Sequence, residues 1–140
     1  SQITDFSHVF DAYRNWRLRE FNEDLTEWDV SNGMKFTSMF WGCESFNGDI
    51  SAWDVSAAVD MAYIFWGCSS FNGDLSSWDA SNVTNLRSAF ADCRSFNGDV
   101  SSWRVANATN LSYTFYACIS FNADLSSWDV RNVTDFDSTF

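Results

Sequence analysis

The sequence predicts an α/β solenoid, a coil in which each 25-residue unit contributes one short parallel strand and one short helix. Three observations carry this prediction. Five segments align without a gap from starts at residues 21, 46, 71, 96 and 121. Aromatic residues and cysteines recur at the same places in these segments. The apolar spacing within one unit changes from that of a strand to that of a helix.

The repeated positions form columns that we expect to stack into a continuous core. A Phe-Asn pair opens each unit, Trp and Phe occupy its eighth and twentieth positions, and Cys occupies the twenty-third position of the four complete units. Because one strand and one helix cannot bury their apolar faces alone, stacking of the units places Trp on Trp and Phe on Phe. The predicted core residues are Trp28, Trp53, Trp78, Trp103, Trp128, Phe40, Phe65, Phe90, Phe115, Cys43, Cys68, Cys93 and Cys118.

The unit at residues 71–95 illustrates the expected elements. Trp78 and Ala80 lie on one face of a short strand over residues 78–80. Four apolar residues then follow at i, i+3, i+7 and i+10, which places them on one face of a helix. These four residues are Val83, Leu86, Phe90 and Cys93.

The whole chain, residues 1–140, is interpreted as a single repeat array. It begins and ends at the same phase of the repeat, and a solenoid needs capping units, so we expect a fragment of a longer chain. The array divides into a partial repeat with an insertion at 1–20, repeats at 21–45, 46–70, 71–95 and 96–120, and an incomplete repeat at 121–140.

Five extra residues lie around residues 11–20, and this segment carries Arg14, Arg17 and Arg19. Two interpretations are open. The insertion is either a helix about one turn longer, with Tyr13 in the place that Cys43 takes elsewhere, or a local docking loop.

The string FN-x-D-L-S-S-W-D-V-x-N-V-T-N/D, followed by Phe90 and Cys93, resembles the BspA-like leucine-rich repeat family, a domain of unknown function typical of mycoplasma and other microbial surface proteins. The likeness covers residues 21–140 and, with the insertion, 3–20. It implies a leucine-rich-repeat-like, right-handed coil. It also implies surface attachment and protein binding, with no cofactor and no catalytic residue. Arg104 departs from the Asp79 type without changing the expected fold.

Composition excludes several classes of partner. The net charge of −11 argues against nucleic acid and anionic membranes, which require clustered Lys and Arg. The apolar runs are too short for a transmembrane segment. The large apolar content, with 14 Phe and 8 Trp, argues against disorder.

The repeated carboxylates and thiols each have a structural and a functional interpretation. Single cysteines 25 residues apart form no zinc pattern, so buried thiols are favoured over metal ligands, disulfides or nucleophiles. In-register carboxylates repel one another, and turn N–H groups, the Asn column or a bound calcium ion could offset this. The candidate calcium ligands are Asp24, Asp49, Asp74, Asp99 and Asp124.

Variable columns carry the strongest functional signal. Positions expected on the solvent side of the predicted helix are aromatic in several units, and exposed aromatic clusters mark binding surfaces. The alternative is that these rings pack on each other or over the ends of the core. The candidate partner-binding residues are Trp41, Tyr63, Trp66, Tyr113, Tyr116 and Ile119.

These observations favour a non-enzymatic module that binds or braces a protein partner. It is expected either at a microbial cell surface, as the resemblance implies, or as an accessory structural subunit of a larger, for example organellar, assembly. Carbohydrate binding through Tyr and Trp is the alternative. A polysaccharide-acting enzyme is the third hypothesis, and it is disfavoured because a ladder gives every carboxylate the same environment, whereas catalysis needs two different ones.

Overall fold

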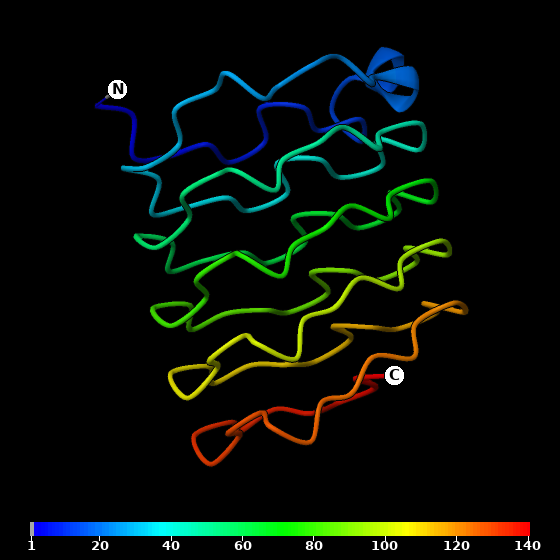
Figure 1. Cartoon of the computed structure of the whole chain (residues 1–140). Helices are drawn as coiled ribbons and strands as arrows, with labels where there is room; N and C mark the ends of the chain where they lie inside the picture. The colour runs from blue at the N-terminus through cyan, green and yellow to red at the C-terminus, as the bar shows by residue number, and fades with distance from the viewer. Residues whose placement is uncertain (1) are drawn as a thin grey trace.

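The chain winds into a stack of similar loop-shaped turns, and its two ends lie at opposite ends of the stack (Figure 1). The structure is a computed structural model that describes residues 2–140. Each turn takes up one repeat, so residues 25 apart lie side by side, as the parallel bridges from Lys35 to Asp60 and from Asp60 to Asn85 show. The described residues contain one helix, the 3-10 helix η1, Trp16–Glu20.

The predicted α/β solenoid is wrong. Residues 2–140 contain no α-helix, and their parallel pairing consists of isolated single-residue bridges rather than strands. The leucine-rich-repeat-like coil, which the resemblance implied, is therefore not observed. Where a helix was expected, the chain makes separate tight turns, in which Ala89 N–H donates to the Leu86 carbonyl at 3.1 Å and Cys93 N–H to the Phe90 carbonyl at 3.0 Å.

The helix fails to form because the N–H groups of this segment donate hydrogen bonds to carbonyls of the neighbouring turn. The N–H groups of Leu86, Ser88 and Phe90 reach carbonyls of the next unit at 3.0, 2.8 and 2.9 Å. Ser88 and Asp92 have φ of 52° and 58°, in the left-handed region. Such a residue reverses the chain locally, so neither a helix nor a continuous strand propagates through it.

Two aspartates turn the chain at the opposite side of four of the five units, and the unit at 96–120 keeps only the first of them because Arg104 replaces the second. Asp74 Oδ1 accepts the N–H of Ser76 at 2.9 Å and its hydroxyl at 2.6 Å, and Asp79 Oδ1 accepts the N–H of Ser81 at 2.9 Å. A short polar side chain that holds the backbone two residues ahead favours a turn over a strand. These bonds replace the expected strand over residues 78–80 with two corners.

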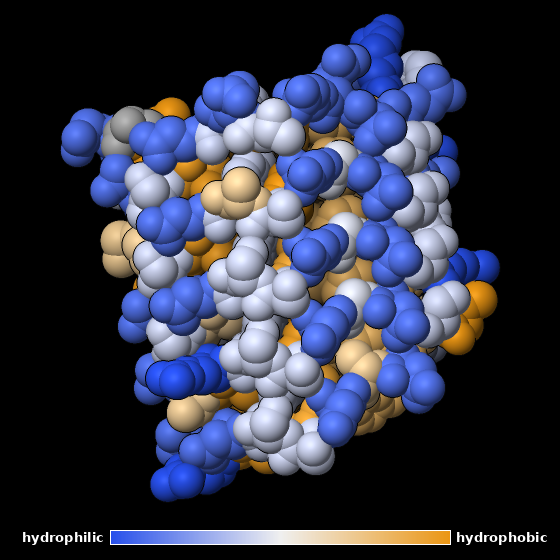
Figure 2. All heavy atoms as spheres, viewed as in Figure 1, coloured by the Kyte–Doolittle hydropathy of each residue, from blue (hydrophilic) through white to orange (hydrophobic). Residues whose placement is uncertain are grey.

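The core is a set of side-chain columns that run along the stack. Phe65 stacks between Phe40 and Phe90 at centroid distances of 5.6 and 5.5 Å, and it packs on Phe71 of the adjacent column at 4.4 Å. Each fully buried Phe contributes about 1.5–3 kcal/mol from the removal of apolar surface from water. On the face that Figure 2 shows, polar side chains lie in parallel columns, with apolar surface visible between them.

A tryptophan column closes the other side of the core. Trp78 stacks between Trp53 and Trp103 at 6.4 and 6.3 Å, and its indole N–H donates to the Ile50 carbonyl at 3.0 Å. The predicted core residues at the ends of the array are less covered, because they have a neighbouring turn on one side only. Trp28 is exposed, Trp128 and Cys118 are half-buried, and all the others are buried.

Candidate functional site

A row of aromatic rings follows the outer side of the stack. Trp41 lies 5.4 Å from Tyr63 and 4.4 Å from Trp66, measured between ring centroids. After a break, Tyr113 and Tyr116 continue the row in edge-to-face contact at 5.6 Å. Tyr13 begins it, stacked on Trp41 at 5.2 Å. The aromatic row comprises Tyr13, Trp41, Tyr63, Trp66, Tyr113 and Tyr116.

The break in the row is a groove of about 850 Å³. Ser88 and Ala91 occupy the positions at which the flanking units carry rings, and they are only 7% and 3% exposed. They form the floor of the groove, and Trp66 and Tyr116 line it from the units before and after. We call this feature the Ala91 groove.

The charges at the groove are mostly cationic. Arg94 is paired with Asp92 at 2.8 Å, whereas Arg87 has no ion-pair partner in the part of the chain that the structure describes. The Arg87 guanidinium lies 6.0 Å from the centroid of the Tyr63 ring. The groove is thus a local cationic and aromatic site on a chain of net charge −11.

Five of the six predicted partner-binding residues line this one groove, and Ile119 does not. Ile119 is 79% exposed. The residues selected from the sequence did not include Arg87, Ser88 or Ala91, which also line the groove. Their signal was available, since small residues at Ser88 and Ala91 interrupt two columns that are aromatic in the units on both sides.

The aspartates proposed as calcium ligands are held by their own turns. Asp49 Oδ1 accepts the hydroxyl and the N–H of Ser51 at 2.7 and 3.0 Å, and these bonds lower the pKa of Asp49 below its usual value. The pKa of Asp74 is lowered in the same way by Ser76. Among residues 2–140 no group of three or more His, Cys, Asp or Glu residues is placed to hold a metal ion.

The four cysteines are free thiols in one column. Cys68 and Cys93 donate to the carbonyls of Phe40 and Phe65 at 3.0 and 2.9 Å. Burial raises the pKa of both thiols well above 9.0, so they remain protonated at neutral pH. A protonated, enclosed thiol is a poor nucleophile and a poor metal ligand.

The insertion neither lengthens a helix nor places Tyr13 in the cysteine column. Tyr13 is 80% exposed and belongs to the aromatic row, so the interpretation that it replaces Cys43 is wrong. The inserted segment ends in η1, where the Asn15 side chain accepts the N–H of Arg17. Trp16 of η1 is exposed, with the Arg17 guanidinium 5.3 Å from its ring centroid.

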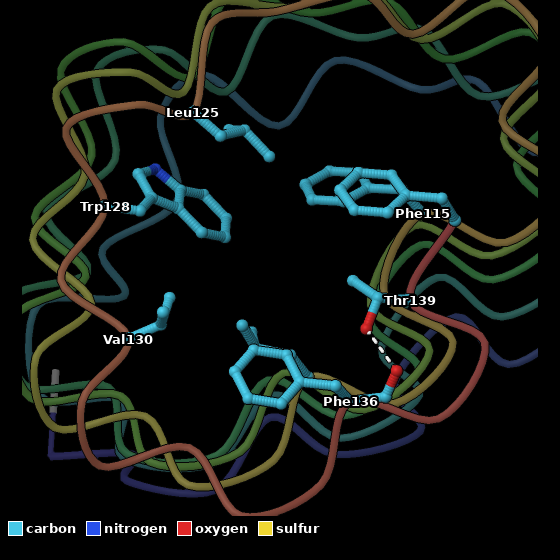
Figure 3. A pocket seen from close by; sticks show the side chains of 8 residues that line it. Phe115, Leu125, Trp128, Val130, Phe136 and Thr139 are labelled. Carbon is cyan, nitrogen blue, oxygen red and sulfur yellow. Dashed lines mark hydrogen bonds between the residues drawn. The ribbon is translucent and has the colours of Figure 1, made fainter.

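A second hollow, of about 460 Å³, lies at the C-terminal end of the stack. Leu125, Trp128, Val130 and Phe136 surround it together with Phe115 (Figure 3). These residues belong to the core columns, and in the units above, the same space is filled by side chains of the following turn. The hollow is therefore an uncovered end of the core, and the Ala91 groove is the stronger candidate site.

The fold and the groove define a repeat protein of stacked turns with an aromatic side face. The chain belongs to the family described as Mycoplasma protein of unknown function, DUF285, which matches residues 1–90 and again residues 48–140. Neither a search of curated proteins nor a search of solved structures found a significant match. Within residues 2–140 no helix has the length and apolar character to cross a membrane.

Proposed function

We propose that this chain is a non-enzymatic module that binds and braces a protein partner through its aromatic row. The observation that carries the proposal is the groove, in which rings from three units line one hollow on the outside of a packed core. Tyr and Trp dominate the energetics of protein interfaces because they combine a large apolar area with few rotatable bonds. Because the stack already holds these side chains in place, binding loses little conformational entropy from ordering them.

The rest of the molecule supports a bracing role. The inner Phe, Trp and Cys columns are continuous through the stack, and no described side chain has a buried nitrogen or oxygen atom without a hydrogen-bond partner. The Asp side chains are occupied with turns of equivalent geometry, which gives them no division into acid and base. The BspA-like resemblance favours a microbial surface as the setting, and an accessory subunit of a larger assembly is the other setting.

The test is co-purification of a partner from the source cells with tagged protein. Trp66→Ala should release a partner that the wild-type chain retains, because the substitution removes a ring from the lining of the groove. Trp16→Ala is the matched control, since Trp16 is an exposed tryptophan outside the aromatic row. Both variants must first show the wild-type circular dichroism spectrum. Equal recovery of the partner with Trp66→Ala and wild type would contradict the proposal.

Carbohydrate binding is the second candidate, favoured by the stacked, partly exposed rings of Tyr13 and Trp41. Tyr13, at the end of the row, is 80% exposed, and an exposed aromatic ring is the kind of surface that the apolar face of a sugar contacts. Binding predicts a saturable change in tryptophan fluorescence on titration with neutral oligosaccharides. A flat titration with Trp41 intact would remove this candidate.

A further inference from the structure

We propose that the Ala91 groove receives an aromatic side chain of a partner polypeptide that carries an Asp or Glu beside it. The inserted ring would fill the break in the aromatic row, and the carboxylate would pair with Arg87. This inference rests on the proposed function and names the chemistry of the partner segment.

The width of the groove suits a single aromatic ring. Neighbouring turns of a parallel-paired backbone lie ~4.8 Å apart, so Trp66 and Tyr116, two turns apart, are separated by ~10 Å. A ring placed midway between them would lie ~5 Å from each, within the 4.5–7 Å that aromatic pairs prefer. The row itself shows such spacings, since Trp41 lies 5.2 Å from Tyr13 and 5.4 Å from Tyr63. The groove therefore has room for one ring.

The groove lining is dominated by aromatic rings. Trp41, Tyr63, Trp66, Tyr113 and Tyr116 all contribute to it. Two of its polar groups are already occupied, since Asp92 is paired with Arg94 at 2.8 Å and the Tyr113 hydroxyl donates to Asp137 at 3.1 Å. An inserted aromatic side chain would pack its ring against those of the lining.

The groove also carries a cationic side chain that suits a carboxylate. Arg87 is exposed at the groove and lacks a carboxylate partner among the described residues, although the chain carries 19 Asp and Glu. A guanidinium forms its strongest hydrogen bonds with a carboxylate. The net negative charge of the chain does not prevent this pairing, because charges beyond about 8 Å are largely screened at physiological salt.

The experiment uses three acetylated, amidated peptides, Gly-Glu-Phe-Glu-Gly, Gly-Lys-Phe-Lys-Gly and Gly-Glu-Ala-Glu-Gly, titrated into the full chain labelled with nitrogen-15. The acidic phenylalanine peptide should shift the amide signals of Ser88 and Ala91 and bind about tenfold more tightly than either of the others. Arg87→Gln should abolish the preference for the acidic peptide over the basic one. Equal affinity for all three peptides would overturn the inference.

A variant that fills the groove isolates the site. Ala91→Trp installs the residue that Trp41 and Trp66 already carry at this position of their units, so the stack accommodates it. It should weaken binding of the acidic phenylalanine peptide at least tenfold, whereas Ala106→Trp, outside the groove lining, should leave it unchanged. Undiminished binding to Ala91→Trp would overturn the inference. Tighter binding of an oligogalacturonate than of the peptide would also overturn it, because the occupant would then be an acidic sugar.

The same variants separate this inference from the proposed function. If Trp66→Ala releases the natural partner while Ala91→Trp retains it, the aromatic row binds protein but the groove takes no ring, and only this inference fails. If both variants retain the partner, both proposals fail. Loss of the partner with both variants is the expected result.

Discussion

Replacement of Trp78 by Phe tests how strongly the tryptophan column joins successive turns. The Trp78 indole N–H donates to the Ile50 carbonyl at 3.0 Å within the buried core. Trp78→Phe keeps a ring in the column but removes the donor, and a buried acceptor left unpaired costs about 1–3 kcal/mol. The smaller ring leaves a cavity that costs about 1 kcal/mol more. We therefore expect a loss of about 2–4 kcal/mol in the free energy of unfolding.

Two tryptophans in the same column provide matched controls. Trp128 donates to the Val100 carbonyl at 2.9 Å but is half-buried, so water replaces the lost bond and Trp128→Phe should cost about 1 kcal/mol. Trp28 is exposed and its indole N–H has no acceptor among the described residues, so Trp28→Phe should cost less still. Urea denaturation followed by tryptophan fluorescence measures all three variants. A cost for Trp78→Phe no larger than that for Trp28→Phe would refute the reasoning.

Three further predictions concern the backbone, the aspartates and the thiols. Gly67 has φ of 74°, so Gly67→Ala should destabilise the chain by about 1 kcal/mol. Ala117 has φ of 57°, so Ala117→Gly should not destabilise it. Thermal denaturation of the two variants measures whether the melting temperature falls only for Gly67→Ala. The Ser56 hydroxyl and N–H lower the pKa of Asp54, so its stabilising contribution is present above about pH 4 and is lost as the pH falls through the lowered pKa. Asp54→Asn keeps the acceptor without the charge, so its melting temperature should fall less than that of the wild type between pH 7 and pH 3, and an equal fall would count against this explanation. Iodoacetamide should label Cys118 before Cys93, because Cys118 is half-buried whereas burial raises the pKa of Cys93 well above 9.0. Mass spectrometry of the labelled native protein measures the order, and earlier labelling of Cys93 would contradict the prediction.

Sequence reasoning located the repeat and its columns because those depend on identity at a fixed period. Phe40, Phe65 and Phe90 lie over one another in the structure as the 25-residue spacing requires. Side-chain stacking of this kind needs only that each turn has the same length and shape. It does not depend on which backbone conformation the turn adopts.

The backbone conformation was mispredicted because the deciding interactions are non-local. Apolar residues at i, i+3, i+7 and i+10 also arise when successive i to i+3 turns each direct one residue inward, as at Leu86 and Phe90. The left-handed conformations of Tyr63, Ser88 and Tyr113 are uncommon for these residue types and are stabilised by bonds to neighbouring turns. One local signal was available: Gly67 and its counterpart Gly42 fall within the predicted helices, where glycine is unfavourable.

The candidate site was only partly visible in the sequence for a similar reason. The exposed aromatic residues could be selected as variable, large and apolar. The groove depends on Ser88 and Ala91, whose significance comes from the size of their neighbours one turn away. A residue that matters because it is small is recognised only when the units are compared column by column.

The most direct test of the stacked-turn architecture is the measurement of scalar couplings across backbone hydrogen bonds by nuclear magnetic resonance, since each coupling identifies the acceptor of one N–H. The structure predicts couplings from the Tyr63 and Phe65 amides to the carbonyls of Arg87 and Ala89, one turn away, where the bonds are 2.9 Å long. Couplings from the same amides to carbonyls four residues earlier would show an α-helix in this segment and would contradict the account.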